Sequence, residues 1–228
     1  MCLNRCVYTI YVFCIALILG AGPALAGGPP QTGVQEYRLT YKVKRDGALI
    51  GSYAFDVREA RDSYAFDARL EIDVSILGFS VYALKHKRSE EWRNGRLVSL
   101  EGRSIYDGDE RYKIRLKHDT ENSYRLKVNG DTQLLKGRIV SFSPRQPASW
   151  DQARLISLKG NADTVTRHKR GTRQLTINGK RYWAERYRLK GDIVRDLWYD
   201  DKKRLLKLSY KKDGATITFV RKSIVQAE

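Results

Sequence analysis

Two short stretches of the chain place carboxylates beside tryptophan, a combination suited to cleaving or holding a sugar. They are DLWYD at residues 196–200 and SEEW at residues 89–92. Alternate residues of an extended strand share a face, so the two outer aspartates and the tryptophan of the first stretch would project together. A hydrolase would use Asp196 and Asp200, or Glu90. In the competing interpretation, which we favour, these acids pair with lysines and arginines of neighbouring strands.

Other catalytic arrangements are missing from the sequence. The three histidines, His86, His118 and His168, are far apart in the sequence, and two have cationic neighbours that disfavour a metal ion. The chain has no G-x-S-x-G elbow and no G-x-x-x-x-G-K-[ST] phosphate loop. We therefore predict no catalytic residue, no metal and no cofactor, and expect a protein that is not an enzyme.

The first 26 residues have the layout of a cleavable signal peptide. Arg5 precedes an apolar run from Cys6 to Gly22, and residues 24–26, ALA, form a small-x-small cleavage site. All three cysteines lie within this segment, so the mature chain has none to form a disulfide or carry a lipid anchor. The sequence predicts export to the periplasm without lipid anchoring, followed by a flexible Gly/Pro-rich leader at 27–35.

The predicted mature chain is strongly basic. Without Arg5, 42 basic side chains face 26 acidic ones, a formal charge of +16. For an exported protein, the accessible anions are lipid headgroups and acidic polysaccharides, and nucleic acid is the less favoured partner. The residues that we predict for an anion-binding surface are Lys113, Arg115, Lys117, Arg125, Lys127, Arg167, Lys169 and Arg170.

The remaining sequence has the pattern of an antiparallel sheet. Six Asn-Gly or Asp-Gly pairs, each suited to a two-residue hairpin turn, begin at residues 46, 94, 107, 129, 178 and 213. Between them, apolar and polar residues alternate with period two, as in SYAFDARLEIDV at 63–74. We predict an all-β fold, a single domain at 36–225, in which an antiparallel meander of roughly 11–13 strands curls into a barrel or half-barrel.

One stretch, residues 143–164, interrupts this pattern. Ser149 stands three residues before Gln152, which is the spacing of a helix capping box, so we predict a short helix near 149–157. The stretch is either a simple crossover loop or a lid over the open end of the sheet, with Trp150 inside.

Three segments resemble a group of bacterial exported proteins known mainly as a domain of unknown function. They are EYRLTYKVKRDGALIGSYAFDV at 36–57, GFSVYALKHKRSEEWRNGRLVSLEGRS at 78–104 and AERYRLKGDIVRDLWYDDKKRLLKLSYKKDGATITFVR at 184–221. The resemblance implies a strongly curved antiparallel sheet, similar to the half-open barrels of lipoprotein carriers, which hold acyl chains on a concave apolar face. It implies no catalytic residues.

These observations favour a monomeric binding or carrier module for a lipid or other anionic amphiphile. The ligand would lie on the concave face of the sheet, and the residues that we expect to line it are Tyr53, Phe55, Tyr64, Phe66, Trp150, Trp183 and Trp198. Two alternatives remain. The protein is an envelope interaction protein that binds an anionic membrane surface or an acidic polymer through its basic face, or it is the carboxylate hydrolase considered above.

Overall fold

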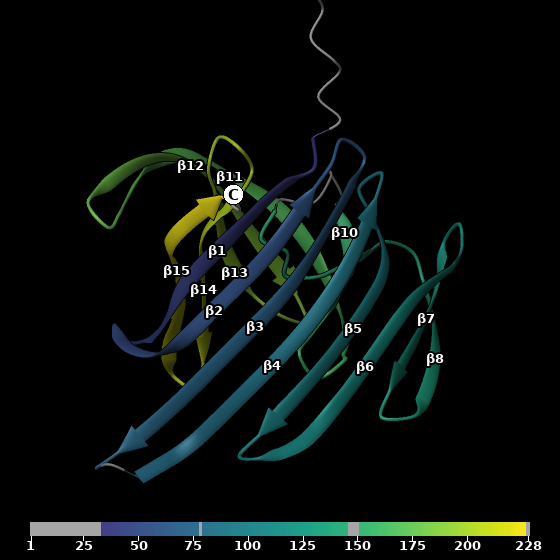
Figure 1. Ribbon diagram of the computed structural model, residues 1–228, viewed down its shortest axis with the longest axis horizontal. Helices are drawn as coiled ribbons and strands as arrows, with labels where there is room; N and C mark the ends of the chain where they lie inside the picture. Colours follow the sequence, from purple (N-terminus) through teal and green to yellow (C-terminus); the bar gives the residue numbers. More distant parts are fainter. Residues whose placement is uncertain (1–32, 78, 146–150, 227–228) are drawn as a thin grey trace, which may run out of the picture. The chain divides into compact units, whose positions relative to one another are not determined.

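The computed structural model describes residues 33–77, 79–145 and 151–226, all within one compact unit that begins at Gly33 (Figure 1). These residues form a single sheet of fifteen strands. The strands are β1 (Gln35–Arg45), β2 (Ala48–Glu59), β3 (Ser63–Ile76), β4 (Phe79–Arg93), β5 (Arg96–Tyr106), β6 (Asp109–Thr120), β7 (Ser123–Val128), β8 (Asp131–Lys136), β9 (Ile139–Val140), β10 (Gln152–Ile156), β11 (Ala162–Ile177), β12 (Lys180–Gly191), β13 (Arg195–Tyr199), β14 (Leu205–Lys212) and β15 (Ala215–Gln226). The predicted all-β class is confirmed.

The six Asn-Gly and Asp-Gly pairs form the predicted turns. Each Asn or Asp has a positive φ between 47° and 51°, and the glycine that follows is also in the positive-φ region. This conformation matches the twist of a two-residue hairpin to that of its flanking strands. The turns therefore join successive strands into antiparallel hairpins.

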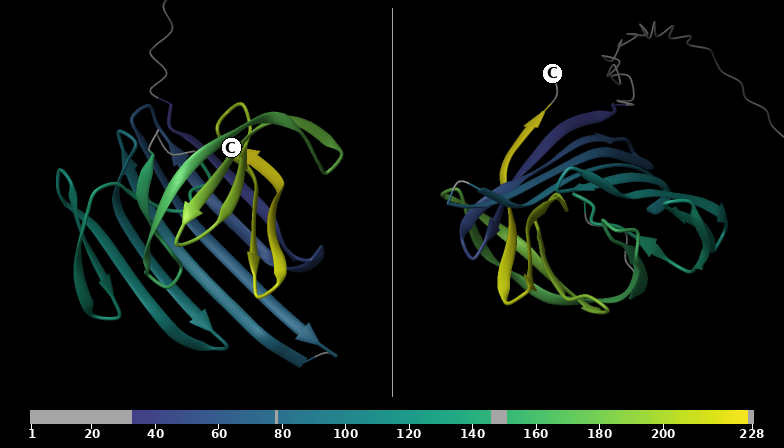
Figure 2. Two further views of the ribbon diagram at one scale, coloured as in Figure 1. Left: turned by 180° about the vertical axis from the view of Figure 1, so that it is seen from behind. Right: turned by 90° about the horizontal axis from the view of Figure 1, so that it is seen from below.

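The strand order is β8-β7-β6-β5-β4-β3-β2-β1-β15-β14-β13-β12-β11-β10-β9. Strands β1 and β15 pair at the centre of this order, while β8 and β9, which are neighbours in the chain, occupy opposite edges. Figure 2 shows the sheet curled so that its two halves face each other around a common interior. The result is a barrel-like sheet that is not closed by hydrogen bonds between β8 and β9.

The predicted helix near 149–157 is wrong. Residues 152–156 form β10, which pairs antiparallel with β11 and parallel with β9. The reason is the period-two burial of this segment, because Ala153 and Leu155 are buried while Gln152 and Arg154 are exposed. Tertiary packing of these apolar residues overrides the capping-box spacing. Residues 146–150, which include Trp150, lie outside the described residues, as do residues 1–32 with the predicted signal peptide.

The interior of the barrel is filled by its own side chains. Inward residues from both halves of the sheet form one apolar core. Its largest fully buried members include Tyr41, Phe55, Phe66, Leu100, Leu116 and Ile156. A filled interior stabilises the fold through burial of apolar area. It also restricts the space for a ligand to places where this packing stops.

A second apolar cluster lies apart from this core, under the long β11–β12 hairpin. It contains Ile177, Ala184, Trp198 and Leu206. The tip of the hairpin is held near β15, because the Asn178 side-chain amide donates to the carbonyl oxygens of two consecutive β15 residues, at 3.0 Å each. The hairpin thus covers part of the sheet's second face.

Candidate binding site at the mouth of the barrel

One end of the barrel is crossed by the segment Ser141–Arg145, which we call the crossing segment. It follows β9 and reaches β14, where Leu205 donates its backbone N–H to Pro144 at 2.8 Å. On the way, Ser143 shares a 2.9 Å hydrogen bond with the hydroxyl of Tyr64 on β3. Arg145 forms an ion pair with Glu59 on β2. The segment is therefore tied to strands in both halves of the sheet.

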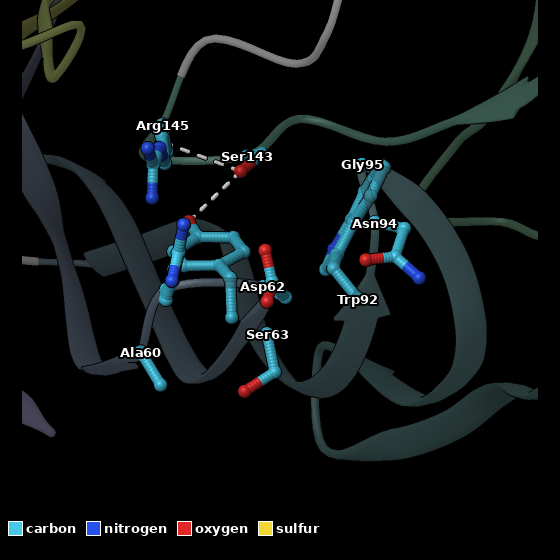
Figure 3. Close-up of a pocket in the computed structure, with 10 residues that line it drawn as sticks. Ala60, Asp62, Ser63, Trp92, Asn94, Gly95, Ser143 and Arg145 are labelled. Carbon is cyan, nitrogen blue, oxygen red and sulfur yellow. Dashed lines mark hydrogen bonds between the residues drawn. The ribbon is translucent and has the colours of Figure 1, made fainter. Parts of the chain in front are cut away.

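A cavity of about 360 Å³ lies beside the crossing segment, and we call it the mouth pocket (Figure 3). The turn from β2 to β3, the turn from β4 to β5 and the crossing segment form its walls. Its lining residues are Ala60, Arg61, Asp62, Ser63, Tyr64, Trp92, Asn94, Gly95, Ser143 and Arg145. The two aromatic residues are buried, whereas Arg61, Asp62 and Asn94 are exposed. The pocket thus combines an aromatic floor with a polar, charged rim.

The charged groups that line the mouth pocket are the guanidiniums of Arg61 and Arg145 and the carboxylate of Asp62. Arg61 forms no ion pair with any described residue. Arg145 is paired with Glu59, whose other carboxylate oxygen accepts a hydrogen bond from the Tyr37 hydroxyl at 3.1 Å. Arg138 donates to the Gly95 carbonyl at 2.6 Å, and burial lowers the pKa of its guanidinium. Because Arg61 is unpaired, it is available to an anionic group entering the pocket.

Below the floor, β4 points a row of polar side chains into the barrel. His86, Arg88 and Glu90 alternate along the strand and are each at most 2% exposed. Glu90 accepts hydrogen bonds from the Trp92 indole at 2.9 Å and from the Ser141 hydroxyl at 2.6 Å. Burial raises the pKa of the Glu90 carboxyl. This carboxylate connects the floor of the mouth pocket to the crossing segment.

Arg88 joins the row to the opposite half of the sheet. Its guanidinium lies 3.5 Å from Glu90 and donates to the backbone carbonyl of Ser157, after β10, at 2.9 Å. Its partners across the strands are Ala68 on β3 and Gly102 on β5. These two small residues leave room for the long side chain. A large inward residue flanked by small ones is a signal that could have identified the row, but sequence reasoning considered His86 and Glu90 separately and did not consider Arg88.

His86 is held in one neutral form by a chain of hydrogen bonds. The Ser104 hydroxyl donates to the Leu158 carbonyl at 2.6 Å, so it must accept the proton on Nδ1 of His86, 2.7 Å away. Nε2 of the ring is then an unprotonated nitrogen, buried without a hydrogen-bond partner among the described residues. Burial lowers the pKa of His86 from 6.5 to about 2, and the Arg88 charge adds to this effect.

We expect His86 to make the protein sensitive to acid. Below pH 6.5 the unfolded chain binds a proton that the folded protein does not bind, so stability falls by up to about 1.4 kcal/mol per pH unit. His86→Gln keeps a donor for Ser104 and removes this titration. The free energy of unfolding of both proteins is measured in urea from neutral pH to about pH 5. As the pH is lowered, it should fall more for the wild type than for the variant. A difference between the two proteins that does not change with pH would contradict this assignment.

The two aspartates of residues 196–200 do not form a joint site. Strand β13 ends at Tyr199, so Asp200 lies in the turn instead of continuing the face of Asp196. Asp196 is paired with Arg186 at 3.0 Å, whereas Asp200 is paired with Arg221 at 2.8 Å. Each carboxylate is thus bound to a different arginine, which agrees with the interpretation that these acids form structural ion pairs with basic residues. The geometry offers no support for a hydrolase that uses both.

The residues predicted to line a ligand are in different places. Tyr53, Phe55 and Phe66 are core residues of the filled interior, and Tyr64 alone of the seven lines the mouth pocket within the described chain. Trp183 is 64% exposed on β12. Trp198 is buried in the second apolar cluster, with cations of Arg173, Arg186 and Lys207 5.0–5.8 Å from its ring centroid. Trp150 lies outside the described residues. Trp92, the second aromatic of the pocket floor, was noted beside Glu90 in the sequence but was not among the predicted lining residues.

The predicted anion-binding residues fall into two groups. Lys113, Arg115 and Lys117 on β6 lie beside Arg125 and Lys127 on β7, and all five are exposed. Arg167, Lys169 and Arg170 belong to β11, near the other end of the strand order. Arg167 is partly buried with its guanidinium 5.1 Å from the Tyr187 ring centroid, and Lys169 is paired with Glu185 at 3.0 Å. The first group is thus the more exposed one.

The described residues contain no group of three or more His, Cys, Asp or Glu side chains that could hold a metal ion. They also contain no helix that is long and apolar enough to cross a membrane.

Comparison with known proteins supports the fold. The family model described as Domain of unknown function (DUF6134) matches residues 41–222. A solved structure, described as the crystal structure of a beta-barrel-like protein of domain of unknown function DUF1849 from Brucella abortus, superimposes with a TM-score of 0.62. The similarity covers 86% of this chain and 100% of that chain at 9% sequence identity, so it shows a shared fold alone. No curated protein matches the chain.

Proposed function

The chain belongs to the DUF6134 domain family, and we propose that it is an exported, non-enzymatic protein that binds an anionic amphiphile at the mouth pocket. The observation that carries this proposal is the pocket itself, which buried aromatic rings line together with the Arg61 guanidinium, a cation that forms no ion pair with any described residue. Ligand sites typically combine an apolar cavity with a few placed polar groups. The expected signal peptide supports a location in the periplasm, where lipids with anionic headgroups are available.

The volume of the pocket limits what can be bound. About 360 Å³ is near the lower end of the range of small-molecule sites. A second cavity, beside Val140 and Leu155, has only about 20 Å³, which is room for about one water molecule. Because the interior is packed, a long acyl chain has no space deep in the barrel. We therefore propose that the headgroup and the first part of the acyl chain lie at the mouth. This position differs from the one predicted from the sequence, in which the ligand lies along the whole concave face.

The pocket offers a separate contact for each part of such a ligand. The faces of Tyr64 and Trp92 provide apolar surface for methylene groups. Arg61 and Arg145 provide guanidinium groups, which match the geometry of phosphate and carboxylate oxygens. The Ser143 hydroxyl and the backbone of the crossing segment complete the wall.

We expect Arg61→Glu to weaken the binding of dodecyl phosphate about tenfold or more, because it replaces the available cation at the rim with an anion. Arg61 is exposed and forms no ion pair with the described residues, so the fold should be retained. The affinity is measured by isothermal titration calorimetry. Arg45→Glu, which makes the same charge change at an exposed residue at the end of β1, is the matched control and should have little effect.

Two results would contradict this function. The first is a failure of the wild-type protein to bind dodecyl phosphate while also carrying no amphiphile when it is purified from the periplasm and examined by native mass spectrometry. The second is equal loss of affinity in the two arginine variants, which would indicate a general charge effect in place of a site at the mouth. Dodecyltrimethylammonium, with the opposite charge, should bind more weakly than dodecyl phosphate.

A further inference from the structure

Four basic residues stand directly opposite one another across four adjacent strands. Arg69 on β3 pairs with Lys87 on β4, Lys87 with Arg103 on β5, and Arg103 with Lys113 on β6. All four side chains are exposed on the outer face of the sheet. We call this row the basic ladder. Because neighbouring strands lie about 4.8 Å apart, the ladder spans roughly 14 Å.

The cationic surface continues beyond the ladder along β6 and β7. Arg115 lies opposite Lys127, and Lys117 lies opposite Arg125. These four side chains are also exposed. Two further like-charged cross-strand pairs therefore adjoin the end of the ladder at Lys113.

Like charges that face each other across strands destabilise a sheet, so this arrangement needs neutralisation. The arginines have local acids: Arg69 contacts Asp56 at 3.0 Å, Arg103 contacts Glu110 at 2.8 Å, and Arg115 and Arg125 have longer contacts with Glu101 and Asp119. The four lysines of this surface form no ion pair with any described residue. Its unneutralised charge is thus on Lys87, Lys113, Lys117 and Lys127.

We propose that this outer surface binds a linear acidic polysaccharide, with the chain running along the basic ladder across the strands. A polyuronate carries one carboxylate on each sugar, so its charges recur on the same scale as the strand spacing. A flexible chain can follow a curved sheet, whereas a flat bilayer meets such a face over a smaller area. No exposed aromatic side chain stands within the ladder, so it lacks the stacking platform that single-stranded nucleic acids use.

Most of the large exposed apolar residues lie away from this surface, although Leu134 on β8, 58% exposed, borders it opposite Arg125. Leu77, Phe79 and Val81 are 54–93% exposed at the β3–β4 turn, where β4 has not yet begun to pair with β5. The four residues of the ladder and the four that adjoin it on β6 and β7 are all charged, which suits a hydrophilic polymer. This inference is independent of the mouth pocket, which is built from other residues at one end of the barrel.

The test compares two variants with the same net charge. In the ladder variant, Lys87, Lys113, Lys117 and Lys127 are all changed to Gln. In the control variant, Lys42, Lys190, Lys202 and Lys222, which are exposed and also lack ion pairs with described residues, are changed to Gln. Binding to immobilised polygalacturonate is measured by biolayer interferometry at low and high salt, because screening should weaken a contact between exposed charges.

We expect the ladder variant to bind polygalacturonate about tenfold more weakly than wild type. The control variant should lose much less affinity for the polymer. Equal losses would overturn the proposal, since they would show attraction to net charge alone. A wild-type protein that fails to bind the polymer would also overturn it. Vesicles of phosphatidylglycerol are the second arm: if the ladder variant loses vesicle binding but keeps polymer binding, the surface serves a membrane and the proposal is wrong.

Discussion

Arg221→Met is expected to lower the free energy of unfolding by about 3–5 kcal/mol, because it leaves a buried carboxylate without its cation. The guanidinium of Arg221 lies 2.8 Å from the Asp200 carboxylate, and the two side chains are only 6% and 8% exposed. The other carboxylate oxygen of Asp200 accepts the backbone N–H of Arg204 at 2.8 Å. The loss therefore affects the turn that joins β13 to β14 as well as the ion pair.

The measurement is urea unfolding with both midpoint and slope recorded, so that a change in stability is separated from a change in the compactness of either state. Arg38→Met is the matched control. It breaks an ion pair of similar length with Asp56, at 2.9 Å, but these side chains are 50% and 38% exposed. Exposed pairs contribute about 0.2–1 kcal/mol. Equal destabilisation by the two variants would show that burial does not determine the strength of the Asp200–Arg221 pair.

Arg88→Met is expected to lower the free energy of unfolding by a similar amount, about 3–5 kcal/mol. The reason is that the Arg88 guanidinium is almost completely buried and has two partners. It neutralises Glu90 and donates to the Ser157 carbonyl. In the variant, Glu90 keeps its hydrogen bonds from Trp92 and Ser141 but loses the nearby positive charge. Since that charge lowers the pKa of Glu90, its removal should raise the pKa of this carboxyl further.

The pH dependence provides a second check on Arg88→Met. A carboxyl whose folded pKa is raised contributes stability at low pH and loses it as the pH rises through the folded pKa. The deficit of the variant should therefore shrink as the pH is lowered from neutral towards the ordinary glutamate pKa of about 4.5. The double variant Arg88→Met/Glu90→Gln should recover part of the loss at neutral pH. If the double variant is as unstable as the sum of the two single changes, the two residues are not coupled.

The first half of the fold could be predicted closely from the sequence. The sequence predicts strands at 48–59, 79–93 and 96–106, which are the bounds of β2, β4 and β5, because an Asp-Gly or Asn-Gly turn stands at one end of each or at both and period-two alternation fills them. Prediction failed where these local signals are absent. β9 has only two residues, β10 follows a misleading capping-box spacing, and their parallel pairing depends on contacts between distant parts of the chain.

The candidate site was less predictable than the fold. The mouth pocket consists largely of turn residues, and turns reveal little about which of them meet in space. Glu90 was recognised as an acid beside a tryptophan, but its burial with Arg88 depends on the small residues of two neighbouring strands. The pairing of Asp200 with Arg221 joins segments whose proximity depends on the order of β13, β14 and β15 in the sheet. Register across several strands is needed before such contacts can be inferred.

The strand order also has a consequence for folding. Among the described strands, every pairing except β1 with β15 joins strands that are consecutive in the chain. The segment β1–β8 can thus assemble through short-range hairpins alone. The segment β9–β15 can assemble through short-range hairpins and the short parallel pairing of β9 with β10. The pairing of β1 with β15 instead brings together residues such as Tyr37 and Gln226. It closes the longest loop in the sheet and carries the largest loop-closure entropy, so we expect the assembly of the two segments at this seam to limit the folding rate.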